Sequence, residues 1–278
     1  MIHTMKDGIV DIAYEGLLGK KTGISTGFHD LDQSLCGGLQ NDYLYVLGGR
    51  PAMGKTSFAL CLASNLCKHG KKVLYYSLEM NAENLVKRLI TLESMNKKDE
   101  YEKTVRRIKG YRFLVNDDPE TLVEVIGAYN EGDNGGDPDR DEDDADIIIV
   151  DNVQFLRSFE DENDSDHDRL EYICRVLKEK ALERHIPILL LTNLSRTLEK
   201  RKIKNRRPLL CDLHEWDPVS VYADVVMLLY RDEYYDSDTD RKGIAEIKIA
   251  KNVTGLGAVC ELVYLGCGRF WNMRSIEE

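Results

Sequence analysis

The chain has 278 residues, a hydrophobic fraction of 42% and a formal net charge of −11, enough for one large α/β domain or two small ones. It has neither a signal peptide nor an apolar run long enough to cross a membrane, so we expect a cytoplasmic protein without membrane association. The acidity is local, because residues 131–168 hold 16 of the 49 acidic and 2 of the 38 basic residues. The rest of the chain is mildly basic, and the net charge does not exclude nucleic acid as a partner.

Residues 4–19 have the apolar spacing of a weak amphipathic helix. Gly8 and Gly16 lower its intrinsic stability, so we expect this helix to need a docking surface. The segment Gly23-Ile24-Ser25-Thr26-Gly27 then breaks the pattern. We therefore predict a linker-type helical segment over residues 1–21 and a main domain over residues 22–278.

A complete phosphate-binding loop, G-x-x-x-x-G-K-[ST], occupies residues 49–56 with the sequence GRPAMGKT. A strand-like run precedes it at residues 43–47, and an apolar helical run follows from Ser57, which is the context of a working P-loop. We expect the Lys55 amine to reach the β- and γ-phosphates of ATP and the Thr56 hydroxyl to bind Mg²⁺. The residues predicted to bind the nucleotide are Gly49, Arg50, Pro51, Ala52, Met53, Gly54, Lys55, Thr56 and Ser57.

Strand and helix patterns alternate after this loop. A strand is predicted over residues 72–79, a helix with Leu85, Leu89 and Leu92 in its apolar stripe, a strand over 111–116 and a helix around 122–129. The acidic run at 131–146 has glycines and a proline but almost no apolar residue, which predicts a mobile surface loop. A calcium loop is the alternative, but the D-x-[DN]-x-[DN]-G spacing is absent.

The second half continues the same alternation. An apolar strand ends in a carboxylate at residues 147–151, an acidic loop is predicted at 159–168, a helix at 169–184 and a buried strand at 188–191, followed by several β-rich runs. Continuous apolar strands alternating with helices indicate a mostly parallel sheet covered on both faces. The predicted fold is a RecA-like α/β P-loop domain with a central sheet flanked by helices.

Three polar residues near the ends of predicted strands are candidates for catalysis. Asp151 closes a strand where a Walker B aspartate would hold Mg²⁺, although an aspartate there can also cap a helix. Glu79 ends its strand at the edge that faces the nucleotide and could orient an attacking water, or it could belong to the first turn of the next helix. Asn193 follows the strand at 188–191, where an amide could sense the γ-phosphate.

At this point the sequence resembles the bacterial replicative DNA helicases of the DnaB type over about residues 5–273. The blocks that carry the resemblance occur in the family's order: TGISTGFHDLDQSLCGGL, GRPAMGKTSFAL, YYSLEMNAENLVKRL, IIIVDNVQFL, LLTNLSRTLEKR and ADVVMLLYRDEYY. The resemblance implies a RecA-like ATPase that forms a hexameric ring and moves along single-stranded DNA. It also implies that helix 4–19 is a linker that docks on a neighbouring subunit, and we expect no counterpart of the family's N-terminal primase-interacting domain.

By position, the resemblance assigns phosphate, Mg²⁺ and catalytic roles to Lys55, Thr56, Glu79 and Asp151. At the γ-phosphate sensor the family usually has glutamine, whereas this chain has the shorter Asn193. The implied cofactors are ATP and Mg²⁺. The implied partners are single-stranded DNA, further copies of the chain, and a helicase loader or primase.

Two segments depart from the family's pattern. The family's K-Q-R-N-G segment, which supplies a lysine and an arginine finger to the next subunit's ATP, reads Lys251-Asn252-Val253-Thr254-Gly255 here. Lys251 is retained as a candidate catalytic residue, but Val253 cannot stabilise negative charge. The DNA-contacting segment D-L-R-E-S-G reads DLHEWD at residues 212–217. Its candidate DNA-binding residues are His214, Glu215 and Trp216, and Trp216 could stack on a base or fill a packing site.

These observations favour an Mg²⁺-dependent ATPase and helicase of the DnaB type that unwinds DNA in replication. The altered finger favours an alternative, a degenerate DnaB paralogue that binds ATP and acts in assembly or regulation with little motor activity. A RecA-type ATPase of recombination is a third interpretation, less favoured because the helicase blocks occur in order.

Overall fold

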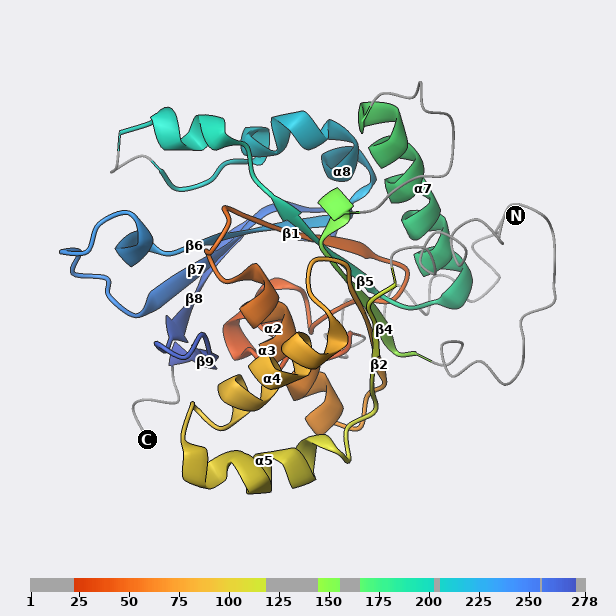
Figure 1. Cartoon of the computed structure of the whole chain (residues 1–278). Coiled ribbons are helices and arrows are strands. Elements are labelled where there is room, and N and C mark those ends of the chain that lie inside the picture. Colours follow the sequence, from red (N-terminus) through yellow and green to blue (C-terminus); the bar gives the residue numbers. More distant parts are fainter. Residues whose placement is uncertain (1–22, 119–144, 156–165, 203–205, 256, 274–278) are drawn as a thin grey trace.

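The computed structural model describes residues 23–118, 145–155, 166–202, 206–255 and 257–273 (Figure 1). The predicted helices at 4–19 and 122–129, most of the acidic run at 131–146 and the start of the stretch at 159–168 lie outside these residues. The division of the chain at residue 22 therefore remains a prediction.

A nine-stranded sheet runs through the described part of the chain, in the order β3-β2-β4-β5-β1-β6-β7-β8-β9. The first six strands in this order are parallel and the last three are antiparallel. Their bounds are β1 Leu44–Gly49, β2 Val73–Ser77, β3 Phe113–Asn116, β4 Ile147–Asp151, β5 Ile188–Asn193, β6 Val225–Tyr230, β7 Ile244–Asn252, β8 Ala258–Tyr264 and β9 Phe270–Asn272. The mostly parallel sheet is confirmed.

The described α-helices include three that the sequence did not predict, α2, α5 and α8. The α-helices are α2 His29–Ser34, α3 Lys55–Lys68, α4 Ala82–Glu93, α5 Tyr101–Ile108, α7 Asp166–Arg184 and α8 Asp217–Tyr222. The short 3₁₀ turns are η1 Lys98–Glu100, η3 Val153–Phe155, η4 Arg196–Lys200, η6 Leu210–Trp216 and η7 Asp232–Tyr234. Within the described residues, none of these helices has the length and apolar character needed to cross a membrane.

Both faces of the five central parallel strands, β2, β4, β5, β1 and β6, are buried, as the continuous apolar runs predict. Along β4, Ile147 and Ile149 pack in the core that α2, α3 and α4 cover, whereas Ile148 and Val150 pack in the core beneath α7 and α8 (Figure 1). The three leucines predicted for the stripe of α4 are all buried. Burying such a side chain stabilises the fold by roughly 1.5–3 kcal/mol. The two cores pack against the parallel strands from both sides. Because these strands run in the same direction, their carboxyl ends meet at one edge of the sheet.

The last strand closes the sheet beside the phosphate loop and the start of the domain. The Phe270 ring packs edge-on against Phe58 of α3, and a Cβ on Gly54 would lie 3.2 Å from Phe270 Cζ. Asn272 in β9 accepts a hydrogen bond from His29 N and donates one to Gly27 O, both at 2.9 Å. Residues far apart in the sequence therefore support the N-terminus of α3 together.

Glu93, at the end of α4, joins α3, α4, α5 and the β8–β9 turn. Its carboxylate accepts hydrogen bonds from Ser64 Oγ at 2.7 Å, Lys68 Nζ at 2.9 Å and Arg107 Nη2 at 3.0 Å, and Arg269 Nη1 lies 3.7 Å away. The Glu93 side chain is 5% exposed. Burial alone raises a carboxyl pKa, but the hydrogen bonds and charges of Lys68, Ser64 and Arg269 prevail, and the Glu93 pKa is lowered.

Glu93→Gln is expected to lower the free energy of unfolding by about 2 kcal/mol, because charged hydrogen bonds of this kind are worth roughly 1.5–3 kcal/mol. Since the folded-state pKa is lowered, the contribution is complete above the unfolded pKa of about 4.3 and is lost as pH falls through the folded pKa. Urea unfolding at pH 7 and at pH 3.5 measures both effects. Glu102→Gln is the matched control, because the Glu102–Arg106 pair at 3.5 Å is solvent-exposed and should contribute little. Equal losses in the two variants would contradict this account of Glu93.

Candidate functional site

The phosphate loop connects β1 to α3 at the carboxyl edge of the sheet. Gly54 has a φ of +110°, and the Cβ of any other residue would press on the Phe270 ring, so glycine is required both for its conformation and for its size. Ala52 also has a positive φ of 61°, which is uncommon outside glycine. Pro51 and Ala52 are exposed, whereas Met53 is buried. The first turn of α3 begins at Lys55 and presents its free backbone N–H groups at this edge, a geometry that favours an anion.

Lys55 lies folded across the loop. Its Nζ donates hydrogen bonds to Gly49 O at 3.0 Å, Arg50 O at 3.3 Å and Asn193 Oδ1 at 2.6 Å. Burial lowers the pKa of Lys55 to about 8, because the charged amine is desolvated. The Arg50 guanidinium points away from the loop edge, donating to Leu194 O at 2.7 Å and pairing with Glu199. A bound phosphate would give the Lys55 amine the counter-charge that this buried position lacks.

Asp151 ends β4 and is 3% exposed. Its Oδ2 accepts a hydrogen bond from the Tyr75 hydroxyl at 2.8 Å, and its buried Oδ1 has no partner of good geometry among the described residues. Burial raises the pKa of this carboxyl, while the nearby Thr56 hydroxyl acts to lower it. A buried carboxylate oxygen without a donor, next to a hydroxyl, matches the oxygen ligands that Mg²⁺ prefers. Thr56 and Asp151 therefore fit a magnesium site.

Glu79 lies two residues beyond the end of β2, which stops at Ser77. The prediction that Glu79 ends the strand is therefore wrong, because the chain turns at Ser77, whose Oγ donates to Met80 O. The Glu79 side chain is exposed. Burial is the main cause of the pKa shifts of Lys55 and Asp151, and the Glu79 charge acts on both groups in the raising direction, so it is felt at the same edge of the sheet.

Asn193 is the last residue of β5, so the strand extends past the predicted end at Leu191. Gly49 lies beside it in register on β1, which explains its contact with the Lys55 amine. Gln154, which the sequence analysis missed, lies next to this group. Its Nε2 donates to Thr192 Oγ1 at 3.0 Å, and its buried Oε1 has no partner among the described residues.

An arginine–aromatic pair lies next to Met53 and Gly54 of the phosphate loop. The Arg231 guanidinium lies 3.7 Å from the centre of the Tyr264 ring, and Arg231 Nη1 donates to Met53 O at 3.4 Å. A Cβ on Gly54 would be 3.6 Å from Tyr264 Cε2. These residues are 33 positions apart in the sequence. Arg231 lies in the block ADVVMLLYRDEYY, but Tyr264 lies outside the quoted blocks, so no motif fixes the spacing between them. The pairing of β6 and β8 through β7 is what brings them together.

The candidate DNA-binding residues His214, Glu215 and Trp216 belong to η6, but their side chains lie outside what the structure describes. The start of this segment is firmly held. Asp212 is buried, pairs through both carboxylate oxygens with Arg201, and accepts a hydrogen bond from Leu209 N at 2.7 Å.

Lys251 and Val253 lie at the β7 end of the hairpin with β8. A bulge between β6 and β7 sets the direction of Lys251. Its Nζ donates to Ser220 O at 2.9 Å and Val221 O at 3.2 Å, near the C-terminus of α8. Val253 is 55% exposed. The structure does not bring these two residues to the phosphate loop of the same chain.

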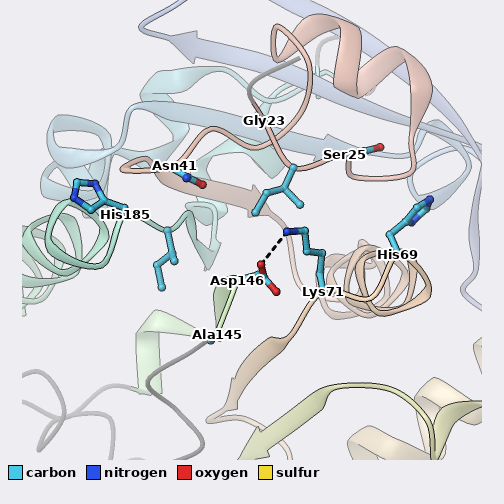
Figure 2. A pocket seen from close by; sticks show the side chains of 10 residues that line it. Gly23, Ser25, Asn41, His69, Lys71, Ala145, Asp146 and His185 are labelled. Atoms are coloured by element: carbon cyan, nitrogen blue, oxygen red, sulfur yellow. Dashed lines mark hydrogen bonds and ion pairs between the residues drawn. The ribbon is translucent and has the colours of Figure 1, made fainter. Parts of the chain in front are cut away.

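A cavity of about 420 Å³ lies at the opposite edge of the sheet (Figure 2). It is lined by residues that precede the parallel strands, among them His69, His185, and the ion pair between Lys71 Nζ and Asp146 Oδ1 at 2.9 Å. None of its lining residues belongs to the phosphate loop. This cavity is therefore separate from the phosphate loop at the carboxyl edge.

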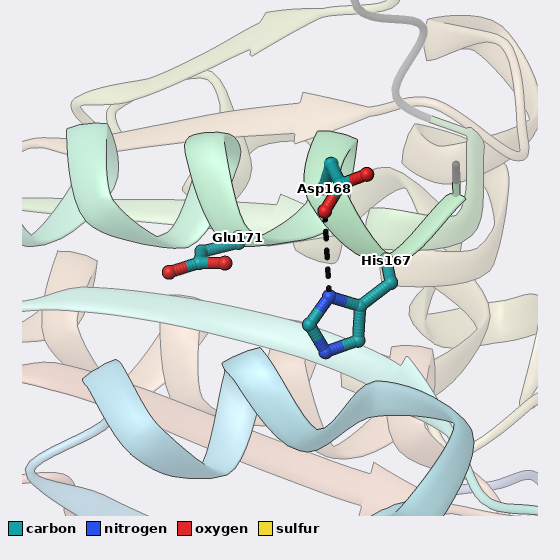
Figure 3. A group of neighbouring side chains, drawn as sticks. All are labelled: His167, Asp168 and Glu171. Atoms are coloured by element: carbon teal, nitrogen blue, oxygen red, sulfur yellow. Dashed lines mark ion pairs between the residues drawn. The ribbon is translucent and has the colours of Figure 1, made fainter. Parts of the chain in front are cut away.

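Three side chains with metal-ligand chemistry gather on the first turns of α7 (Figure 3). His167, Asp168 and Glu171 are all exposed, and their ligand atoms lie within 4.8 Å of one another. Exposed acidic groups on a helix are commonly solvated without an ion, so we assign no metal to this cluster. Nor do the thiols form a site: Cys61, Cys67, Cys174 and Cys260 are buried, whereas Cys36 and Cys211 are exposed.

Comparisons with known proteins agree with this geometry. Residues 23–271 match the family described as "DnaB-like helicase C terminal domain". The chain is 32% identical over 270 residues to the "Probable replicative DNA helicase" of Trieres chinensis and 32% identical over 261 residues to the "Replicative DNA helicase DnaC" of Bacillus subtilis (strain 168). Each match covers 89% of this chain and 56% of the relative, so the chain spans about half the length of these relatives.

Solved structures show the same fold. One of them, an isolated ATPase domain, superposes with a TM-score of 0.83 at 26% identity, covering 98% of this chain and all of that one. A DnaB-like replicative helicase, studied for its interactions with primase, gives a TM-score of 0.82 at 26% identity, with 98% and 68% coverage. The RadB recombinase, with a TM-score of 0.57 at 18% identity and coverage of 90% and 99%, shares the fold alone. The predicted RecA-like fold is confirmed, and the chain belongs to the DnaB-like helicase family, of which its described residues form the C-terminal domain.

Proposed function

We propose that this chain is a Mg²⁺-dependent ATPase that forms a ring on single-stranded DNA and couples ATP hydrolysis to translocation and unwinding. The observation that supports this most directly is the meeting of Lys55, Asp151 and Asn193 at the carboxyl edge of adjacent parallel strands. Glu79 acts on the same edge through its charge. Phosphoryl transfer to water requires a cation, a metal-binding carboxylate, an amide that senses the γ-phosphate, and a second carboxylate.

In this proposal each residue has a distinct task. Lys55 exchanges its bond with Asn193 for the β- and γ-phosphates, and the released amide then contacts the γ-phosphate. Thr56 and Asp151 would hold Mg²⁺, which would screen the charge that develops on the phosphate oxygens. Glu79, exposed at the site, accepts a proton from the attacking water and orients it. The Tyr264 ring and the Arg231 guanidinium offer a flat surface for the base.

A second function, that of an ATP-binding assembly or regulatory protein with little motor activity, is supported by the state of Lys251. Its amine is bound to the C-terminal carbonyls of α8 in its own subunit, and Val253 has no charge to offer a neighbouring nucleotide. Both residues belong to the segment that would complete the next subunit's site. In this alternative the chain binds ATP and assembles, but hydrolysis is slow and is not stimulated by DNA.

One experiment separates the two functions. ATP turnover is measured with and without single-stranded DNA, and strand separation is measured on a forked duplex. A motor should show DNA-stimulated turnover and unwinding. We expect a weak DNA affinity that falls steeply with salt, because phosphate contacts would come from the mildly basic part of the chain outside residues 131–168. ATP binding with unstimulated turnover and no unwinding would favour the regulatory protein. Absence of nucleotide binding would contradict both.

A further inference from the structure

Tyr75 occupies the centre of β2, directly beneath the predicted magnesium site. Its side chain is fully buried, and its ring packs edge-on against Phe113 of β3 with centroids 5.9 Å apart. In the parallel register of β2 and β4, Tyr75 lies beside Ile149 and Ser77 lies beside Asp151. Because residues two apart on a strand share a face, Tyr75 and Asp151 project from the same side of the sheet.

The Tyr75 hydroxyl reaches along this face to the Asp151 carboxylate. It donates to Oδ2 at 2.8 Å. The ring alone would be supplied equally well by phenylalanine, so the hydroxyl is a distinct feature of the site. In a buried position a phenol hydroxyl needs a polar partner, and a buried carboxylate needs donors. Each group therefore satisfies the other.

The consequence for Asp151 is that its two oxygens are not equivalent. Oδ2 is held from below by Tyr75, whereas Oδ1 is buried and has no partner of good geometry among the described residues. A carboxylate held at one oxygen has a restricted side-chain rotation, so its other oxygen has a defined direction. The hydrogen-bond partners of a metal-ligating carboxylate typically change metal affinity or activity by about 10–100-fold when removed.

We propose that Tyr75 is a positioning residue that orients Asp151 and leaves Oδ1 for the magnesium that accompanies the nucleotide. This inference rests on the proposed function, because it requires that the site bind Mg²⁺ with a nucleotide. Tyr75 touches neither nucleotide nor metal and acts through Asp151. The edge-on contact with Phe113 and the complete burial of the ring restrict the directions in which the Tyr75 hydroxyl can point.

The test is a magnesium titration of nucleotide binding, which does not depend on turnover. A fluorescent ADP analogue is bound to the full chain in EDTA and then at increasing Mg²⁺ concentration. For Tyr75→Phe we expect the Mg²⁺ concentration at half-maximal effect to rise by about tenfold or more, while binding in EDTA is unchanged. A general loosening of the fold would weaken binding in EDTA as well, and that result would overturn the proposal.

Tyr45→Phe is the matched control. Tyr45 is also fully buried on the same face of the sheet, but its hydroxyl accepts a hydrogen bond from Gln40 N at 2.7 Å, before the start of β1. We expect Tyr45→Phe to need the same Mg²⁺ concentration as the wild type. An equal shift in both variants, or an unshifted Tyr75→Phe, would overturn the proposal.

A double variant shows whether Tyr75 acts through Asp151. In an Asp151→Ala background, Tyr75→Phe should cause no further shift, because the group that it positions is gone. An additive shift would mean that Tyr75 acts by another route and would overturn the proposal. If the wild-type chain binds no nucleotide in the presence of Mg²⁺, the proposed function fails instead, so the two failures are distinguishable.

Discussion

Lys55→Ala should abolish detectable Mg·ATP turnover, with a loss of at least about 10²–10³-fold, the size seen when one preorganised charge-stabilising donor is removed. The amine is held among Gly49 O, Arg50 O and Asn193 Oδ1, so it lies at the phosphate loop before nucleotide arrives. Its pKa of about 8 means that the unliganded site carries a cation that is only weakly stabilised. Binding of a nucleotide and steady-state hydrolysis both measure the effect.

Lys71→Ala provides the comparison for this prediction. Lys71 lies at the opposite edge of the sheet, where its amine pairs with Asp146 at 2.9 Å. We expect this variant to bind and hydrolyse ATP as the wild type does. If Lys55→Ala retained wild-type turnover, the nucleotide site would have to lie elsewhere in the protein.

Val253→Arg should raise ATP turnover, because it restores an arginine at the position of the family's finger. Arginine fingers supplied in trans are worth about 10³–10⁵-fold in P-loop enzymes. We expect a gain of at least about tenfold, smaller than the full effect of a finger, because we expect Lys251, a compact charge without the planar fork of arginine, to recover part of that effect in the wild type. Val253 is 55% exposed, so the longer side chain can enter without disturbing its own subunit.

The gain should depend on protein concentration, because a finger acts across an interface. Dilution below the association range should make Val253→Arg and the wild type equal, with the oligomeric state followed by light scattering. Lys251→Ala should lower the turnover of the associated protein further. An unchanged rate for Val253→Arg in an oligomeric preparation, or a monomer that hydrolyses ATP as fast as the ring, would refute the idea.

The core of the site was predictable because its residues obey rules of local spacing. The fixed positions of the loop at 49–56, between a strand and a helix, are enough to predict α3 and the place of Lys55 at its start. Asp151 follows four consecutive apolar residues, and a carboxylate at the end of a buried parallel strand must lie at the edge where the other strands end. The apolar stripe of α4 could be predicted for the same reason, because the helical spacing of its leucines is a local property of the sequence.

Other features depend on contacts that no local pattern encodes. Helix α2 has only six residues, of which Leu31 is buried. A segment this short cannot show a helical period in the sequence. Three antiparallel strands follow β6, and their order is set by pairing that only the folded sheet defines. Arg231 meets Tyr264 through that pairing, and Tyr75 meets Asp151 across two strands. In the sequence, a tyrosine within the buried run of β2 looks the same as any core residue.

The closure of the sheet by β9 has a consequence for how the protein is made. The bond between Asn272 and Gly27 joins residues 245 positions apart. At about 5–20 residues per second, a ribosome needs roughly 10–50 s to synthesise the intervening chain. For most of that interval the loop at residues 49–56 has been synthesised, but the Phe270 ring that packs beside Gly54 does not yet exist. The motif that is most evident in the sequence thus acquires its final surroundings more than 200 residues after its own synthesis.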